Sequence, residues 1–222
     1  MATTRVRAKQ IIQAPLPPLN VGTYRTTSSA LHNLKYIGTL SPWPNFKSSV
    51  QAMYNAQVFS RSSTAAVSPG LHNIDPEIVC VGDEHGLQGR FQQAIGQVLG
   101  AALEAQAVPW VVPHHSLSSA YSQPQRLRRV LGQPALYMGE LQSAFGFVST
   151  YNETIFLRQS QLPSGQWHVE YSPVIYSTDM YEPSGSGPSA SMRQCMFYVA
   201  TLASGQGPVN NQTPAAQWVV RS

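Results

Sequence analysis

The stretch 145–175 constrains the fold of this chain more strongly than any other. It contains three short runs, of which the first and third alternate with a period of two, while the middle run is rich in residues that favour strands. Such alternation is typical of neighbouring strands in an antiparallel sheet. Asn152-Glu153 and Leu162-Pro163-Ser164-Gly165 separate the runs, and their side chains favour tight turns. The sequence therefore predicts an antiparallel β-meander over about 145–176.

Three longer segments have apolar residues at helical spacing and should pack with this meander. They cover about 84–105, 125–144 and 192–204. Asp83 is a suitable N-cap for the first helix. Pro134 falls inside the second, where it should end, kink or restart the helix. The fold class that we expect is α+β.

The remaining segments are shorter or less regular. Apolar spacing favours a helix over 45–59 and a short helix over 30–36. Residues 1–20 are basic and contain several prolines, so we expect a disordered or extended tail. Residues 211–222 are predicted to form an irregular tail. The part between the tails, residues 21–210, is long enough for one domain with its own hydrophobic core.

Composition limits the partners and the compartment. Charged residues make up 11% of the chain, and the formal net charge of +4 is compatible with an anionic partner. No apolar run is long enough for a membrane span, and the N-terminus lacks the apolar core of a secretory signal. We therefore expect an intracellular protein, cytoplasmic or nuclear. Cys80 and Cys195 lie far apart, which favours two buried thiols over a disulfide.

Few motifs indicate cofactor chemistry. The chain contains no Gly-x-Ser-x-Gly nucleophile elbow and no glycine-rich phosphate loop, so no small-molecule cofactor is predicted. His114 and His115 are adjacent and would point in different directions on a strand, which favours a plain loop over a metal site. We accordingly expect no metal site from the motifs alone.

Two groups of polar residues remain as candidates for chemistry or binding. Glu84 begins the predicted helix 84–105, where a carboxylate more often stabilises the helix dipole than takes part in catalysis. Gln133 and Tyr137 are four residues apart and should share one helix face.

Arg126, Arg128 and Arg129 form a basic cluster on the next predicted helix. Such a cluster is suited to phosphate groups, although arginines on an exposed helix face are as often simply solvated. Nucleic acid and another protein are therefore both open as partners.

Several sequence blocks together resemble a known family. They are E-H-G-L-Q-G-R-F-Q-Q-A-I-G-Q-V-L, V-P-W-V, L-R-R-V-L-G-Q-P-A-L-Y-M, F-G-F-V-S-T-Y-N-E-T-I-F-L-R-Q and W-H-V-E-Y-S-P-V-I. In this order they resemble fungal proteins with a PD-(D/E)XK nuclease-like domain, of the restriction-endonuclease-like fold. The resemblance covers roughly residues 78–210.

The resemblance implies a set of catalytic residues, and the central members of the set are missing. In that fold a helix bears a glutamate, a meander supplies an aspartate and a Glu-x-Lys strand, and a later helix often carries Gln-x-x-x-Tyr. Glu84 matches the first element, and Gln133 with Tyr137 matches the last. Where Glu-x-Lys is expected, the chain has Ala105-Gln106-Ala107. The chain thus resembles the family with its catalytic middle removed, by genuine loss or by a wrongly joined gene model.

Three functional hypotheses follow from the resemblance. The first is a catalytically incompetent remnant of the nuclease core that acts by binding a protein or nucleic acid, with Arg126, Arg128 and Arg129 as contacts. The second is a residual Mg²⁺-dependent nuclease that uses Glu84, Gln133 and Tyr137 with a carboxylate recruited from elsewhere, such as Asp83 or Glu104. The third is an accessory protein of a fungal metabolic gene cluster, without any role on nucleic acid.

Overall fold

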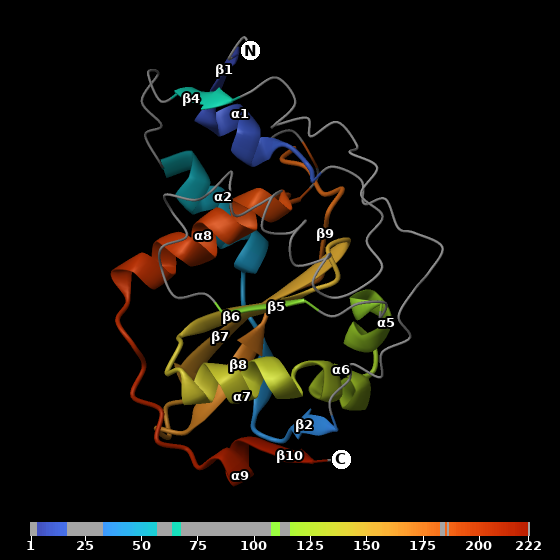
Figure 1. The fold of residues 1–222 in the computed structure, drawn as a ribbon, viewed down its shortest axis with the longest axis vertical. Helices are drawn as coiled ribbons and strands as arrows, with labels where there is room; N and C mark the ends of the chain where they lie inside the picture. Colours follow the sequence, from blue (N-terminus) through green and yellow to red (C-terminus); the bar gives the residue numbers. More distant parts are fainter. Residues whose placement is uncertain are drawn as a thin grey trace.

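A mixed β-sheet forms the centre of the molecule (Figure 1). The computed structural model describes residues 4–16, 33–56, 64–67, 108–111, 116–182, 185 and 187–221. Within these ranges, the strands of the sheet are β3 (Leu40–Pro42), β5 (Val108–Val111), β6 (Phe145–Ser149), β7 (Glu153–Gln161), β8 (Trp167–Tyr171) and β9 (Ile175–Tyr176). Their order is β3-β8-β7-β6-β5, and β9 pairs with β7.

The predicted antiparallel meander is confirmed. β6 pairs antiparallel with β7, and β7 pairs antiparallel with β8. The turn between β7 and β8 lies at the predicted position, where Gly165 has a φ of 83° that glycine adopts without strain. The outer strands β3 and β5 are parallel to β8 and β6 respectively, so the whole sheet is mixed.

Both faces of the meander are buried. Phe147 and Phe156 are register partners, and they pack in the cluster on one face of the sheet. Ile155 and Leu157, which flank Phe156, belong to the cluster on the other face. All five residues of β6 are therefore buried, rather than alternately buried and exposed.

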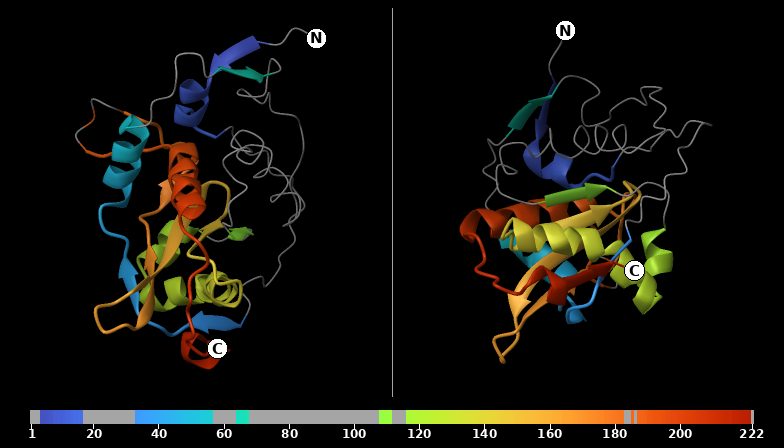
Figure 2. Two further views of the ribbon diagram at one scale, coloured as in Figure 1. Left: turned by 90° about the vertical axis from the view of Figure 1, so that its left-hand side faces the viewer. Right: turned by 60° about the horizontal axis from the view of Figure 1, so that its bottom comes forward.

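Helices cover the two faces of the sheet (Figures 1 and 2). The apolar side chains of each helical layer join the cluster on its own face. One layer contains α1 (Ala8–Gln13), α2 (Phe46–Ala56) and α8 (Met192–Gly205). The other layer contains α5 (Leu117–Tyr121), α6 (Pro124–Val130), α7 (Gly132–Glu140) and, near the C-terminus, α9 (Ala215–Trp218).

Two of the predicted helices are confirmed and one lies outside the described residues. The helix expected over 45–59 is α2, and the helix expected over 192–204 is α8. Ser191 begins α8 with a capping box, in which the Ser191 hydroxyl accepts from the Gln194 amide and the Gln194 side chain accepts from the Ser191 amide. The helix expected over 84–105 falls in a range that the structure does not describe.

The helix expected over 125–144 is two helices, α6 and α7, which meet at Leu131. The break lies where Pro134 is expected to end and restart the helix, because a proline at 134 cannot donate to the carbonyl of Val130, the last residue of α6. Pro134 itself lies in the first turn of α7, where a backbone N–H would have no partner within the helix. The restart also involves a close contact, because a Cβ on Gly132 would lie 2.6 Å from the backbone oxygen of Leu34. Glycine therefore lets α7 begin directly against the neighbouring strand.

Described residues at both chain ends form regular elements where tails were expected. Within the expected tail 1–20, residues 4–13 form β1 (Thr4–Arg7) and α1, and β1 pairs with β4 (Thr64–Val67). Ile12 and Leu16 are buried in the same apolar cluster as side chains of α8, although the surrounding sequence is basic and contains prolines.

The C-terminal end contains regular structure as well. α9 is followed by β10 (Val219–Arg221), which pairs with β2 (Leu34–Tyr36). The short helix expected over 30–36 is therefore wrong in its last three residues, where the backbone hydrogen bonds to β10 instead.

Trp218 fixes this C-terminal segment to the domain. Its indole N–H donates to the carbonyl oxygen of Ala135 at 2.8 Å, and its ring meets that of Tyr36 edge-on with centroids 5.1 Å apart. Only 3% of the Trp218 surface is exposed. Residues 215–221 thus form regular structure that closes the lower helical layer.

We expect Trp218→Ala to destabilise the protein by about 3–5 kcal/mol, since it removes a buried aromatic side chain and leaves a cavity. Val220→Ala, at the 37% exposed position in the same strand, should change stability by less than about 0.5 kcal/mol. Urea unfolding followed by circular dichroism measures both values. Equal stability of the two variants would show that the C-terminal segment does not pack as described.

Candidate nucleic-acid interface

The predicted site residues that the structure describes lie on two consecutive helices below the sheet. Arg126, Arg128 and Arg129 are in α6, and Gln133 and Tyr137 are in α7. Glu84, Asp83 and Glu104 fall outside the described residues. The structure therefore places the proposed binding residues and the Gln-x-x-x-Tyr pair. It does not test the carboxylates of the nuclease hypothesis.

Arg128 turns inward, toward strand β2. Its Nη1 donates to the carbonyl oxygen of Tyr36 at 3.1 Å and to that of Gly38 at 2.8 Å. The guanidinium carbon lies 5.9 Å from the centroid of the Tyr36 ring, within the range of a cation–π contact. Arg128 thus fixes α6 to β2, and this role occupies part of its hydrogen-bonding capacity.

The Tyr36 hydroxyl group belongs to the same junction. It donates to the carbonyl oxygen of Thr39 at 2.9 Å, and its side chain is fully buried. Burial raises the pKa of Tyr36 well above its ordinary value, while the charge of Arg128 acts in the opposite direction with a smaller effect. The phenol therefore remains neutral at physiological pH, and its role in the junction is structural.

Arg126 and Arg129 are three residues apart and share the outer side of α6. The Nη1 of Arg126 donates to the hydroxyl oxygen of Ser119 at 3.1 Å, and Arg126 is half-buried. Arg129 is exposed. In the part of the chain that the structure describes, neither guanidinium forms an ion pair with a carboxylate. These two arginines are therefore available to an anionic partner.

Gln133 and Tyr137 do share one face of α7, as the spacing predicts. The Nε2 of Gln133 donates to the hydroxyl oxygen of Tyr137 at 3.3 Å. α7 packs close to the sheet, and Gly146 of β6 permits this approach, because a Cβ at that position would lie 2.9 Å from the sulfur of Met138. The pair thus sits on the last helix of the connection between the parallel strands β5 and β6.

Glu153 is a positioning residue that the sequence did not reveal. Its carboxylate accepts from the backbone N–H groups of Leu117 and Ser118, the latter at 3.2 Å, and from the Ser118 hydroxyl at 2.7 Å. Ser116 caps the same helix by accepting from the Ser119 amide. The negative charge at the start of α5 is favourable, and it connects the α5–α6 pair to β7. A pattern of local spacing cannot reveal this contact, which spans 36 residues.

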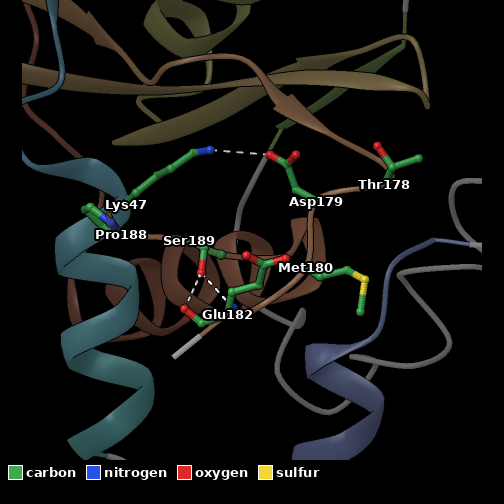
Figure 3. Close-up of a pocket in the computed structure, with 8 residues that line it drawn as sticks. Lys47, Thr178, Asp179, Met180, Glu182, Pro188 and Ser189 are labelled. Atoms are coloured by element: carbon green, nitrogen blue, oxygen red, sulfur yellow. Dashed lines mark hydrogen bonds and ion pairs between the residues drawn. The ribbon is translucent and has the colours of Figure 1, made fainter. Parts of the chain in front are cut away.

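Two other carboxylates, those of Glu170 and Asp179, form ion pairs at separate places in the molecule. The Nε of Arg158 donates to Glu170 at 2.6 Å, and the Arg158 guanidinium lies 4.5 Å from the ring centroid of Trp43. Lys47 and Asp179 form an ion pair at 3.4 Å in a pocket of about 270 Å³ between α2 and the loop after β9 (Figure 3). Among the residues that the structure describes, no group of three or more His, Cys, Asp or Glu side chains could hold a metal ion.

Comparisons with protein families, with curated proteins and with solved structures find no match for this chain. The resemblance to the nuclease-like family therefore remains a prediction. None of the helices in the described ranges is both long and apolar enough to cross a membrane.

Arg128→Ala should lower stability by about 1.5–3 kcal/mol, because it removes charged hydrogen bonds to two backbone carbonyls. Arg129→Ala, one residue further along the same helix, should change stability by less than about 0.5 kcal/mol, because this side chain is exposed. Thermal and urea unfolding of both variants measures the difference. A larger loss for Arg129→Ala than for Arg128→Ala would contradict the assignment of Arg128 to the β2 junction.

Proposed function

We propose that this protein is a catalytically incompetent nuclease-like protein that binds nucleic acid through the outer side of α6, with Arg126 and Arg129 as its contacts. The proposal rests on the different contacts that the three arginines of α6 make. Arg128 is bound to the backbone of β2, whereas Arg129 is exposed and the half-buried Arg126 donates only to the Ser119 hydroxyl among the described contacts. Neither Arg126 nor Arg129 has a described carboxylate partner. Guanidinium groups in this situation suit phosphate oxygens, which accept two parallel hydrogen bonds.

The order of elements supports the nuclease-like part of the proposal. In the family that the sequence resembles, the strand that carries Glu-x-Lys is followed by the helix that carries Gln-x-x-x-Tyr. Here β5 precedes the helix with Gln133 and Tyr137, and the chain then enters β6 parallel to β5. A parallel pair joined through helices is the connection that this order requires.

Catalytic incompetence follows from the residues that stand before β5. The chain has Ala105-Gln106-Ala107 where the resemblance requires a glutamate and a lysine. Without them, the carboxylates that would hold Mg²⁺ near the scissile phosphate and the cation beside the attacking water are missing. The proposed activity is accordingly binding, in an intracellular compartment.

The wild-type protein should not nick supercoiled plasmid DNA in the presence of Mg²⁺ or Mn²⁺. An agarose-gel assay with a matched EDTA lane measures this. Metal-dependent nicking that disappears in Glu84→Ala would contradict catalytic incompetence and support an active nuclease.

DNA binding should weaken steeply with added salt, since each phosphate contact releases a counterion. The slope of log K against log salt is negative, and Arg126→Gln/Arg129→Gln should reduce its magnitude by about 1.8 if each arginine neutralises one phosphate. Fluorescence anisotropy with a labelled DNA duplex measures the slope. Lys9→Gln/Lys47→Gln is the control, because it removes the same charge from α1 and α2 in the opposite layer (Figure 1). A binding constant that does not depend on salt, or equal slopes for the two double variants, would contradict the proposal.

A further inference from the structure

We infer that the cavity between α2 and the loop after β9 is a binding site for a basic α-amino acid, a small molecule with one carboxylate and two cationic groups. The inference is independent of the proposed function, because the cavity lies in the layer of α2 and α8, on the other side of the sheet from α6 (Figures 1 and 3). Its volume is about 270 Å³, near the lower end of the range for ligand sites. A site of this size suits a small metabolite rather than a macromolecule.

Three segments that are far apart in the sequence form the wall of this cavity. Lys47 lies in the first turn of α2, Asp179 and Glu182 lie in the loop after β9, and Ser189 lies just before α8. The ion pair between Lys47 and Asp179 joins two of these segments across 132 residues. The fold therefore brings one basic, two acidic and one hydroxyl side chain to the same hollow.

Contacts outside the cavity hold the loop after β9 in place. The Tyr181 hydroxyl donates to Oδ1 of Asn55, near the end of α2, at 3.0 Å, and its ring centroid lies 5.7 Å from that of Tyr54. The Ser189 hydroxyl oxygen accepts from the Glu182 amide at 2.7 Å, and the same hydroxyl donates to the Glu182 carbonyl oxygen at 3.1 Å. A loop that is held from both sides loses little conformational freedom when a ligand binds.

The charged groups of the cavity satisfy one another only in part. The Lys47 ammonium lies 3.4 Å from Oδ2 of Asp179, and the two side chains are 29% and 25% exposed. Oδ2 also accepts from the Tyr176 amide at 3.2 Å. Among the residues that the structure describes, neither Oδ1 of Asp179 nor the Glu182 carboxylate has a partner. An ion pair with this exposure adds little stability of its own, so both of its members remain able to bind a ligand.

The arrangement of these charges matches a basic α-amino acid. Lys47 and Asp179 are neighbours, as are the carboxylate and the α-ammonium group on one carbon atom of the ligand. In Figure 3 the Glu182 carboxylate lies apart from this pair, as does the cationic group at the far end of the ligand side chain. Charge-assisted hydrogen bonds therefore join the ligand carboxylate to Lys47, the α-ammonium group to Asp179 and the side-chain cation to Glu182. Met180 and Pro188 also line the cavity and offer apolar surface to the methylene chain between the two ends.

The same groups argue against two other classes of ligand. A phosphate group would lie beside the carboxylates of Asp179 and Glu182 with only Lys47 to compensate, and like charges repel each other. A divalent cation would in turn lie beside the Lys47 ammonium. No third acidic, histidine or cysteine side chain joins the two carboxylates in the described part of the chain.

The test compares free L-lysine with two analogues that each lack one charged group. Cadaverine lacks the carboxylate, and L-norleucine lacks the cationic group of the side chain. Isothermal titration calorimetry with the full-length protein should give L-lysine a Kd of about 1 mM or lower, and each analogue an affinity at least about tenfold weaker.

Two single variants test which residue binds which group of the ligand. Lys47→Met should weaken binding of L-lysine about tenfold and remove its advantage over cadaverine. Glu182→Gln should weaken binding of L-lysine to a similar extent and remove its advantage over L-norleucine. Lys35→Met in β2 and Glu140→Gln in α7 are the matched controls, since they remove the same charges on the other side of the sheet and should leave every affinity unchanged. Circular dichroism of each variant checks that it is folded.

A preference for L-lysine over both analogues that the two cavity variants remove separately supports the inference. If L-lysine does not bind at about 10 mM, or if cadaverine binds as tightly as L-lysine, the assignment of a basic α-amino acid is wrong. If Lys47→Met and Glu182→Gln bind L-lysine as the wild-type protein does, the amino acid binds elsewhere and the assignment of this cavity is wrong. None of these results depends on whether the protein binds DNA, so failure of this inference is distinguishable from failure of the proposed function.

Discussion

The arrangement of the molecule depends on the burial of strands β6, β7 and β8 on both faces. A strand with Phe156 facing one layer and Ile155 and Leu157 facing the other requires apolar helices above and below. α8 and α2 fill one side, and α5 to α7 fill the other. The position of α6, and with it the surface that we assign to nucleic acid, is a consequence of this two-sided core.

The junction between α6 and β2 fixes the position of the surface that we propose for binding. Arg128 satisfies two carbonyl oxygens at the end of β2, so α6 and the β2–β10 pair are held as one unit. Glu153 holds the preceding helix from the opposite direction, through the backbone amides at the start of α5. With both ends held, the backbone of α6 keeps a fixed position, which would lower the entropic cost of the binding that we propose.

Much of the central fold could be predicted from local patterns, and the chain ends could not. The strand-favouring residues and turn sequences of 145–176 are visible in the local sequence, and so is the helical spacing in 46–56 and 192–205, which burial of a helix face imposes. Residues 34–36 and 219–221 are strands only because they pair with each other, across more than 180 residues. The structural role of Arg128 likewise depends on a partner 92 residues away in the sequence. The local sequence therefore does not distinguish Arg128 from Arg126 and Arg129. The adjacency of Gln133 and Tyr137, by contrast, required only helical spacing.

We propose that the outer side of α6 binds nucleic acid, while the α1–α2 side does not. Hydrogen–deuterium exchange of the protein with and without a DNA duplex tests this proposal most directly. Slower exchange of backbone amides in 124–131 is expected on addition of the duplex, with unchanged exchange in 46–56. Protection of 46–56 instead, or no protection of either segment at a saturating concentration of the duplex, would contradict it.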